Sequence, residues 1–352
     1  MYRARRLTYR ELVLLLLLAV LEKAWEVSPP AFTSRSGTPA RFQQNSFRTR
    51  ENTELYVSES MDGKFRCNMS ASEKMLVAAL HSAGKKGQQG WAKVQRLYEN
   101  YTGLAVPVYG AALQAAYRCK QFSEAAEMYT NIRSIGNVTV GPVLLMYGMK
   151  TFGKLQDSTA VDSIWQEVLA EGRVDKFLAA ARIDAASEMG DIEEAASILE
   201  FMVNKTVPVY DIHFNSAINA CKNSNHSNRH KAAMYLLDGM LSKHLQPSIV
   251  TFANLVGAHS HAPLDQLEGV LSSMTHKGVG PNQVFTEAVL SALFPGRFTA
   301  AWTVDDICTR LKGASRNRLR VAKSVLKDAR SRGVRLTQLS SMVDQCLQQL
   351  TI

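Results

Sequence analysis

Apolar side chains recur along residues 72–349 at the spacing of one face of an α-helix. Segments of about a dozen residues carry a small or apolar residue, two apolar residues three and four positions later, and a fourth three positions further on. Two clear cases are Ala125–Met128–Tyr129–Ile132 and Ala195–Ile198–Leu199–Met202. Because Gly, Pro or Asn separates the segments, the pattern predicts an all-α protein made of successive short helices.

This pattern repeats with a nearly constant period. Its last apolar residue falls at Tyr101, Ile132, Val168, Met202, Met240 and Met274. The steps between these residues are 31, 36, 34, 38 and 34 positions, which centre near 35. Since a lone hairpin of such helices cannot bury its apolar face, this period predicts stacked helical hairpins. We expect an α-solenoid, a right-handed superhelix, over residues 70–312.

Two junctions between the predicted hairpins resemble those of pentatricopeptide repeat proteins. They are Gln246-Pro247-Ser248-Ile249-Val250-Thr251-Phe252 and Lys277-Gly278-Val279-Gly280-Pro281-Asn282. Residues 211–220 are similar to the first helix of that repeat, and Gly190-Asp191 is similar to its inter-helix turn. The Trp…Leu-Gly…Tyr signature of tetratricopeptide repeats, which share this period, is not visible. The resemblance is specific over residues 175–285 and looser before them.

The resemblance implies a groove for single-stranded RNA in which each repeat holds one nucleotide. It assigns Asn215 and Ser248 to base recognition, and this pair resembles the combination that prefers pyrimidines, with cytosine favoured. Ile212 and Val250 fall at the positions that sandwich the same base. A role in RNA processing, stability, editing or translation is therefore expected.

Most of the expected groove has no legible recognition code. Ala253 occupies the next recognition position, so discrimination there rests on Asn282 alone. Earlier repeats offer Gly110, Val143 and Ala180, none of which has a polar side chain. Residues 51–308 are also mildly acidic, with 26 acidic and 22 basic residues. A protein-interaction scaffold that uses the same concave face for peptides is therefore the alternative to RNA binding.

The basic residues are concentrated at the two ends of the chain. Residues 309–335 hold ten Lys/Arg and one acidic residue, and residues 1–50 hold nine and three. Five of the former lie four or three positions apart, on one face of a helix: Arg316, Arg320, Lys323, Lys327 and Arg330. An RNA phosphate backbone would relieve their mutual repulsion. The alternative is a solvated face on basic C-terminal capping helices, which we expect at residues 313–352.

Residues 1–54 are predicted to be a targeting presequence followed by a linker. Four arginines precede the apolar run 12–21, which is about half as long as a membrane-spanning helix. Residues 28–50 are then rich in Ser, Thr and Arg and contain no acidic residue. The tandem resembles the bipartite leader of algae with complex plastids, so we expect a plastid protein that is not integral to a membrane once processed. A mitochondrial presequence is the second alternative and secretion is the third.

Patterns typical of enzymes are not visible in the sequence. It lacks the motifs of nucleophilic hydrolases, zinc proteases and dinucleotide-binding proteins, and residues 84–90 lack the order of a phosphate-binding loop. The cysteines are dispersed, with no histidine at ligand spacing, and predict buried free thiols in a reducing compartment: Cys67, Cys119, Cys221, Cys308 and Cys346. We expect no catalysis, cofactor, metal or small-molecule substrate. The expected partner is a single-stranded organellar transcript, with other RNA-processing proteins as further candidates.

Overall fold

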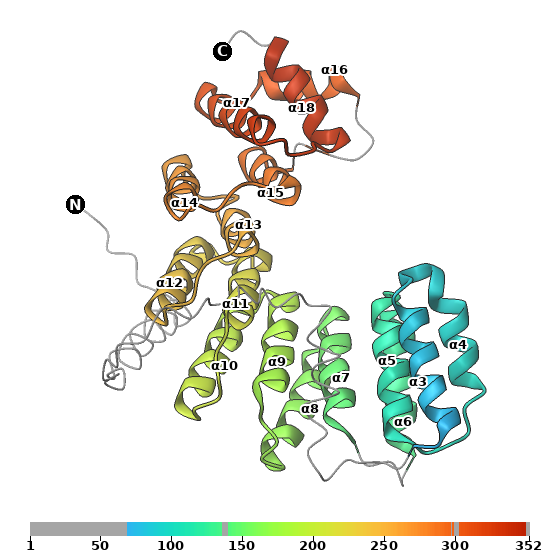
Figure 1. Ribbon diagram of the computed structural model, residues 1–352. Coiled ribbons are helices and arrows are strands. Elements are labelled where there is room, and N and C mark those ends of the chain that lie inside the picture. Colours follow the sequence, from blue (N-terminus) through green and yellow to red (C-terminus); the bar gives the residue numbers. More distant parts are fainter. Residues whose placement is uncertain (1–68, 136–139, 297, 299–302, 350–352) are drawn as a thin grey trace, which may run out of the picture. The chain divides into compact units, whose positions relative to one another are not determined.

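The computed structural model describes residues 69–135, 140–296, 298 and 303–349, and these residues form two compact units (Figure 1). Unit 1 extends to Met189 and includes Glu193–Ile212, whereas unit 2 comprises Gly190–Ile192 and the chain from His213 onward. The described residues contain α-helices and one short 3-10 helix, with no strand among them. The expected all-α, helical-repeat fold is confirmed. The presequence predicted at residues 1–54 lies outside the described residues.

Unit 1 consists of four helical hairpins. The first helix of each hairpin packs against the first helix of the next, and α4, α6 and α8 each also contact the first helix that follows. The helices are α3 (Ala71–Gly84), α4 (Trp91–Glu99), α5 (Val106–Arg118), α6 (Phe122–Ser134), α7 (Pro142–Lys154), α8 (Ser158–Ala170), α9 (Lys176–Met189) and α10 (Ile192–Asn204), with the 3-10 helix η1 (Gly87–Gly90) between α3 and α4.

Unit 2 continues the same alternation and adds one extra helix. Its first helices are α11, whose first two residues belong to unit 1, α13, α15 and α18. The bounds are α11 (Asp211–Asn223), α12 (Arg229–Ser242), α13 (Ile249–Ala258), α14 (Leu264–His276), α15 (Gln283–Leu293), α16 (Val304–Lys312), α17 (Arg316–Ser331) and α18 (Gln338–Gln349). Within this unit α13 packs on α15, and α15 packs on α17 and α18.

The predicted apolar stripes form the core between the helices. On α8 the stripe residues Val161, Ile164, Trp165 and Val168 are all buried, and those of α10 and α12 are buried in the same way. Burying one such side chain stabilises the fold by about 1.5–3 kcal/mol, so a four-residue stripe is the main contribution of each second helix. On α4 only Val94 is fully buried, because this helix belongs to the first hairpin of the described chain.

Second helices from α8 onward end in one recurring turn. A residue with positive φ follows each of them: Gly172, Thr206, His244, Gly278 and Gly333. The next residue donates its amide to the carbonyl five positions earlier, and the acceptors are Val168, Met202, Met240, Met274 and Ala329. Four of these acceptors end the stripes from which the period was read, so the turn and the apolar pattern share one register.

The same turn follows α17, which packs on both α15 and α18, so we assign α17 as the second helix of a repeat that contains an insertion. From Met274 to Ala329 the step is 55 positions instead of about 35, and α16 lies within the added length. Ala322, Leu326 and Ala329 of α17 are fully buried at the stripe spacing. α16 packs on α18. The hairpin pattern thus continues into residues 313–352, whose role as a cap stays a prediction.

The expectation of free cysteines is wrong at one pair. Cys308 of α16 and Cys346 of α18 form a disulfide, with their Cα atoms 5.3 Å apart. Cys119 and Cys221 are free and buried, as expected, and Cys67 lies outside the described residues. The pairing is not visible in the sequence because the cysteines are 38 positions apart and only the inserted helix brings them together.

Two further expectations concerned membrane-spanning helices and metal sites. Among the described residues, no helix is long and apolar enough to cross a membrane. The apolar run 12–21 lies outside that part of the chain. Over the same residues, no group of three or more His, Cys, Asp and Glu side chains is arranged to hold a metal ion.

Candidate nucleic-acid interface

The recognition positions inferred from the sequence correspond to the fifth residue of each first helix. Counted from the helix bounds, these residues are Met75, Gly110, Met146, Ala180, Asn215, Ala253, Glu287 and Met342. Gly110, Ala180, Asn215 and Ala253, which the sequence proposed for recognition, all hold this place in their helices. Val143 does not, because α7 begins at Pro142 and its fifth residue is Met146, which is buried. Asn215 and Glu287 are the polar members of the series, and both belong to unit 2.

Asn215 is held by the helix that follows it in the stack. The hydroxyl of Thr251, which is fully buried, donates to the side-chain oxygen of Asn215 over 2.6 Å. The side-chain amide of Asn254 donates to the backbone carbonyl of Asn215 over 3.1 Å. Because the side-chain oxygen of Asn215 is already engaged, its amide N–H groups are the part available to a guest. Asn215 therefore presents hydrogen-bond donors.

Ser248, the predicted partner of Asn215, is also the N-cap of α13. Its hydroxyl accepts from the backbone N–H of Thr251 at 3.4 Å, and its own N–H donates to the Thr251 hydroxyl at 2.9 Å. The two residues form a capping box, which fixes the start of α13. Thr251 consequently connects both members of the predicted recognition pair, a role that the sequence pattern did not indicate.

Asn282 occupies the equivalent N-cap position of α15. Its side-chain oxygen accepts from the backbone N–H of Phe285 over 2.8 Å, and the residue is exposed. The cap uses the acceptor and directs the remaining amide group toward solvent. The structure thus places Asn282 where a guest could reach it, although Ala253 of the preceding helix offers no polar group beside it.

The predicted sandwiching residues are the second residues of their helices. Ile212 holds this place in α11 and is half-buried, and Val250 holds it in α13 and is 55% exposed. The structure adds Val284 of α15, which is 67% exposed. Isolated exposed valines are ordinary, but here two occur at one position of consecutive packed helices. Their assignment to base stacking stays a prediction, and Val284 would have followed from the sequence had the count continued past Asn282.

Glu287 is the second residue that the sequence reasoning missed. It is the fifth residue of α15, and the hydroxyl of Thr337, immediately before α18, donates to its Oε1 atom over 2.5 Å. Thr337 also lies 2.8 Å, oxygen to oxygen, from the hydroxyl of Ser340. The signal was available in the sequence, since Glu287 follows Asn282 by the same five positions as Ala253 follows Ser248.

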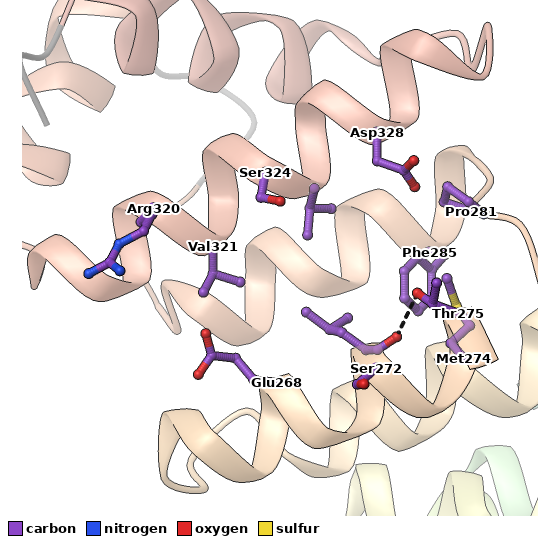
Figure 2. A pocket seen from close by; sticks show the side chains of 12 residues that line it. Glu268, Ser272, Met274, Thr275, Pro281, Phe285, Arg320, Val321, Ser324 and Asp328 are labelled. Carbon is purple, nitrogen blue, oxygen red and sulfur yellow. Dashed lines mark hydrogen bonds between the residues drawn. The ribbon is translucent and has the colours of Figure 1, made fainter.

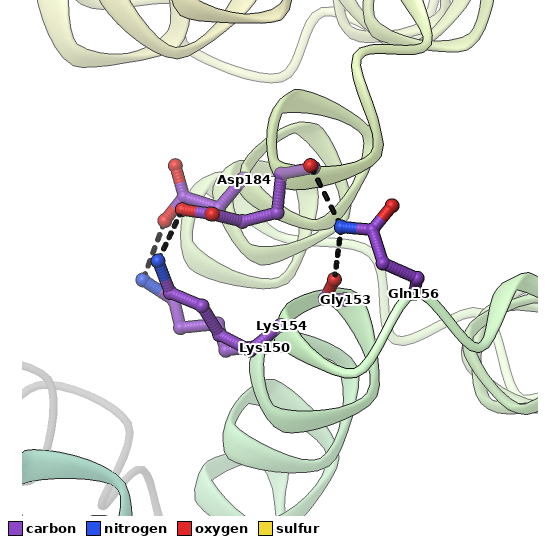
Figure 3. A network of polar contacts seen from close by, with 6 residues as sticks. Lys150, Gly153, Lys154, Gln156 and Asp184 are labelled. Carbon is purple, nitrogen blue, oxygen red and sulfur yellow. Dashed lines mark hydrogen bonds and ion pairs between the residues drawn. The ribbon is translucent and has the colours of Figure 1, made fainter. Parts of the chain in front are cut away.

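In unit 1, two ion pairs join the first helices α7 and α9. Lys150 and Lys154 of α7 pair with Asp184 and Glu188 of α9, each at 2.6 Å. Figure 3 shows the two lysines beside Asp184. Burial lowers the pKa of Lys150, but Asp184, Tyr117 and Tyr147 together outweigh burial and raise that pKa above its ordinary value. The Gln156 amide donates to the Glu188 carbonyl at 2.8 Å. These contacts join α7, and the turn that follows it, to α9.

The five basic residues of α17 are all exposed, as the spacing predicted. Arg330 pairs with Asp344 at 3.0 Å, and the Arg320 guanidinium donates to Asn317 at 2.6 Å. Among the described residues, Arg316, Lys323 and Lys327 pair with no carboxylate. Because α17 is a second helix, this basic face belongs to a different helix row from Asn215 and Glu287. Its assignment to phosphate binding stays a prediction.

A groove lies between α14 and α17, with α15 beneath it (Figure 2). Its volume is about 490 Å³. The walls combine apolar side chains with groups of both charges, namely Leu271, Met274, Phe285, Val321, Glu268, Arg320 and Asp328. Mixed charge does not favour a polyanion inside the groove, although Arg320 belongs both to its wall and to the basic face of α17.

No family model matches the sequence, and no curated protein matches it. Among solved structures, the chain is similar to the pentatricopeptide repeat protein PPR10 from maize, at 17% identity and a TM-score of 0.43, over 86% of this chain and 42% of that one. It is also similar to PPR10 in complex with an 18-nt psaJ RNA element, at 19% identity and a TM-score of 0.43, over 93% of this chain and 55% of that one. The chain thus spans about half the length of these proteins.

Proposed function

We propose that this protein binds single-stranded RNA along the first helices of unit 2 and acts without catalysis of its own. The observation that carries the proposal is the bond from Thr251 to Asn215, which fixes a polar side chain against the first turn of α13, whose second residue, Val250, is exposed. An oriented hydrogen-bonding group next to an exposed apolar group suits a base, whose edge needs polar partners and whose face needs apolar ones.

Single-stranded nucleic acid fits this surface better than a duplex. Asn215, Ala253 and Glu287 occupy one position on three successive first helices, at intervals of 38 and 34 residues. Such a row meets one base per helix only if the bases are unpaired and their edges are free. The row therefore favours a strand that lies across the helices.

The basic face of α17 would add attraction for the phosphate backbone. A single strand that neutralises Z phosphates loses affinity with a salt slope of about −0.7Z. Arg316, Lys323 and Lys327 are exposed on this face, and α17 packs on α15, which carries Glu287 of the first-helix row. We therefore expect the face to strengthen binding without selecting a sequence.

The proposal is tested by titrating the full chain into labelled, unstructured RNA at about 50 and 200 mM salt. Binding is expected to weaken steeply between the two conditions. Replacing Arg316, Arg320 and Lys323 by Glu should weaken binding at low salt and flatten the slope by about two units. Binding that is absent, or equally strong at both salt concentrations, would remove the RNA proposal.

A matched control reverses three exposed cations of unit 1. Lys74, Lys93 and Arg96 lie on α3 and α4 and are exposed, so changing them to Glu alters the net charge by the same amount. The control should retain more affinity than the α17 variant. Equal losses would show that net charge, and not the position of the basic face, determines the binding.

A scaffold for proteins is the second candidate function, and the groove between α14 and α17 favours it. The apolar side chains of its walls, together with charged groups of both signs, suit a peptide better than a phosphate. Charging its floor with Phe285→Asp is unsuitable as a test, because Phe285 is buried in the core. Val321→Glu is more suitable, since it should leave RNA affinity intact if the two surfaces act separately.

We also propose that the protein works in an organelle, with the plastid first and the mitochondrion second. The support is the order of arginines, short apolar run and acid-free Ser/Thr/Arg segment in residues 1–50. Fusing residues 1–54 to a fluorescent protein tests this. Retention of the fusion in the cytosol would contradict the proposal.

A further inference from the structure

Two clusters of the same design occur in unit 2. In the first, Ser248 precedes α13, Thr251 is the third residue of α13, and the Thr251 hydroxyl contacts Asn215. In the second, Thr337 precedes α18, Ser340 is the third residue of α18, and the Thr337 hydroxyl contacts Glu287. Each cluster uses a hydroxyl at the start of one first helix to hold the fifth residue of another first helix.

The two clusters present opposite hydrogen-bonding groups. The side-chain oxygen of Asn215 accepts a hydrogen bond from Thr251, and its N–H groups are left to donate. The carboxylate of Glu287 accepts a hydrogen bond from Thr337, and acceptor positions remain on both of its oxygens. Between them, the fifth residue of α13 is Ala253, which can neither donate nor accept through its side chain. The fifth residues of the three helices therefore offer donors, no polar group and acceptors in turn, and only Asn282 is polar at the middle position.

We infer that Glu287 selects guanine, at the nucleotide two positions from the one that Asn215 meets. This inference rests on the proposed RNA-binding function. All four bases present acceptors to the Asn215 amide, so the pyrimidine preference at that position stays the one implied by the resemblance. Guanine offers two adjacent donors, N1–H and the N2 amino group, which match the two oxygens of a carboxylate.

The other bases fit Glu287 less well. Adenine and cytosine each present one amino group beside a ring nitrogen acceptor, which would face the second carboxylate oxygen. Uracil presents one N–H between two carbonyl oxygens, and both would repel the carboxylate. A matched bidentate contact discriminates between bases by about 1–3 kcal/mol, which corresponds to roughly 5- to 150-fold in affinity. Guanine should therefore be preferred by at least about fivefold.

The arrangement also accounts for a carboxylate on a surface that is expected to meet a polyanion. An acidic side chain beside a phosphate backbone weakens binding through repulsion. At a base edge the same charge strengthens each N–H contact, because charge-assisted hydrogen bonds are stronger than neutral ones. Glu287 is half-buried and held by Thr337, so its carboxylate is fixed in place before a base arrives.

The inference is tested by mixing the full chain with RNA that has a randomised central segment and sequencing the bound fraction. The expected enrichment is a pyrimidine and a guanine separated by one position. Inosine in place of that guanine lacks the N2 amino group and should weaken binding severalfold, whereas 7-deazaguanine keeps both donors and should bind normally. Bound RNA without a guanine preference would overturn the inference while leaving the proposed function intact.

The variant Glu287→Gln separates recognition from folding. Its amide oxygen can still accept from Thr337, so the thermal midpoint should change little, while the guanine enrichment should fall by about fivefold or more. Glu268→Gln removes the same charge from α14, where the residue is exposed, and should keep the guanine enrichment. Equal enrichment in the unmodified chain and Glu287→Gln would overturn the inference. Absence of RNA binding by the unmodified chain would remove the proposed function as well.

Discussion

The hydroxyl of Thr251 lies 2.6 Å from the side-chain oxygen of Asn215, although the two residues are 36 positions apart in the sequence. This distance is close to one period of the repeat. The contact therefore connects equivalent ends of consecutive first helices, and it determines which side of the Asn215 amide a guest can meet. A residue in the core thus sets the chemistry of a residue on the surface.

Replacing Thr251 by Val should loosen Asn215 and remove half of the capping box of α13. The expected loss in the free energy of unfolding is about 1–2 kcal/mol, because the side-chain oxygen of Asn215 and the N–H of Ser248 each lose a partner. The pyrimidine preference should fall with it. Thr251→Ser keeps the hydroxyl and should preserve that preference. Urea denaturation and RNA selection measure the two effects, and a Val variant with unchanged base preference would contradict the role given to Thr251.

Replacing Gly153 by Ala should disturb the packing of α7 on α9. A Cβ atom at Gly153 would lie 2.7 Å from the Cα atom of Ala185, so the two helices would have to separate. We expect a loss of about 1–3 kcal/mol, measured by thermal or urea denaturation. Gly269→Ala on α14 is the matched control. A Cβ there meets no atom within 4 Å, and alanine should be neutral or stabilising by up to about 1 kcal/mol.

Unit 2 should lose stability as the pH falls below about 6.5. Burial lowers the pKa of His259, with His230 and Arg229 adding to the effect and the Leu255 carbonyl opposing it. Burial also lowers the pKa of His230. Both side chains therefore take up a proton at a lower pH in the folded state than in the unfolded chain. The stabilisation is complete above about pH 6.5 and declines as the pH falls toward the lowered folded pKa values.

Thermal midpoints recorded from about pH 7.5 down to about pH 5 would check this dependence. His259→Gln should reduce the slope, since an amide does not titrate in this range. The control His276→Gln changes an exposed histidine on α14 and should leave the slope unchanged. A slope that is insensitive to His259→Gln would exclude this residue as its source.

The pairing of Cys308 with Cys346 should be detectable in the purified, oxidised chain. Peptide mapping without reductant is expected to recover the two cysteines in one linked species. Changing both to Ala should lower the free energy of unfolding by about 2–4 kcal/mol. The double variant Cys119→Ala, Cys221→Ala serves as a comparison, because these buried cysteines are free and their replacement should not respond to reductant. Recovery of Cys308 and Cys346 as free thiols would contradict the pairing.

Local patterns predicted most of the fold because stripe, turn and period all have the same register. Val168, Met202, Met240 and Met274 were identified from apolar spacing, and their carbonyls accept the bonds that close the turns. The inserted helix α16 was missed because it adds length between two elements of one repeat and so breaks the period. Its disulfide was missed for the same reason, since contacts across an insertion leave no spacing in the sequence.

The candidate site was predicted less completely than the fold. Asn215, Ser248, Val250 and Asn282 follow from the position of a residue within its own helix, and the structure places them at those positions. Thr251 acts through a contact with another repeat, which a pattern within one repeat does not contain. Glu287 was missed because the sequence around it differs from the repeat junctions that were used to assign positions within each helix.

The turn that closes each hairpin from α8 onward is complete within that hairpin, and the insertion of α16 leaves the turn after Ala329 unchanged. A repeat of this design can therefore gain a helix between its first and second helices while still packing against the repeats on either side. The length of such a chain consequently does not determine the length of the strand that it binds. Two proteins of equal size could bind strands of different length if they contain different numbers of inserted helices.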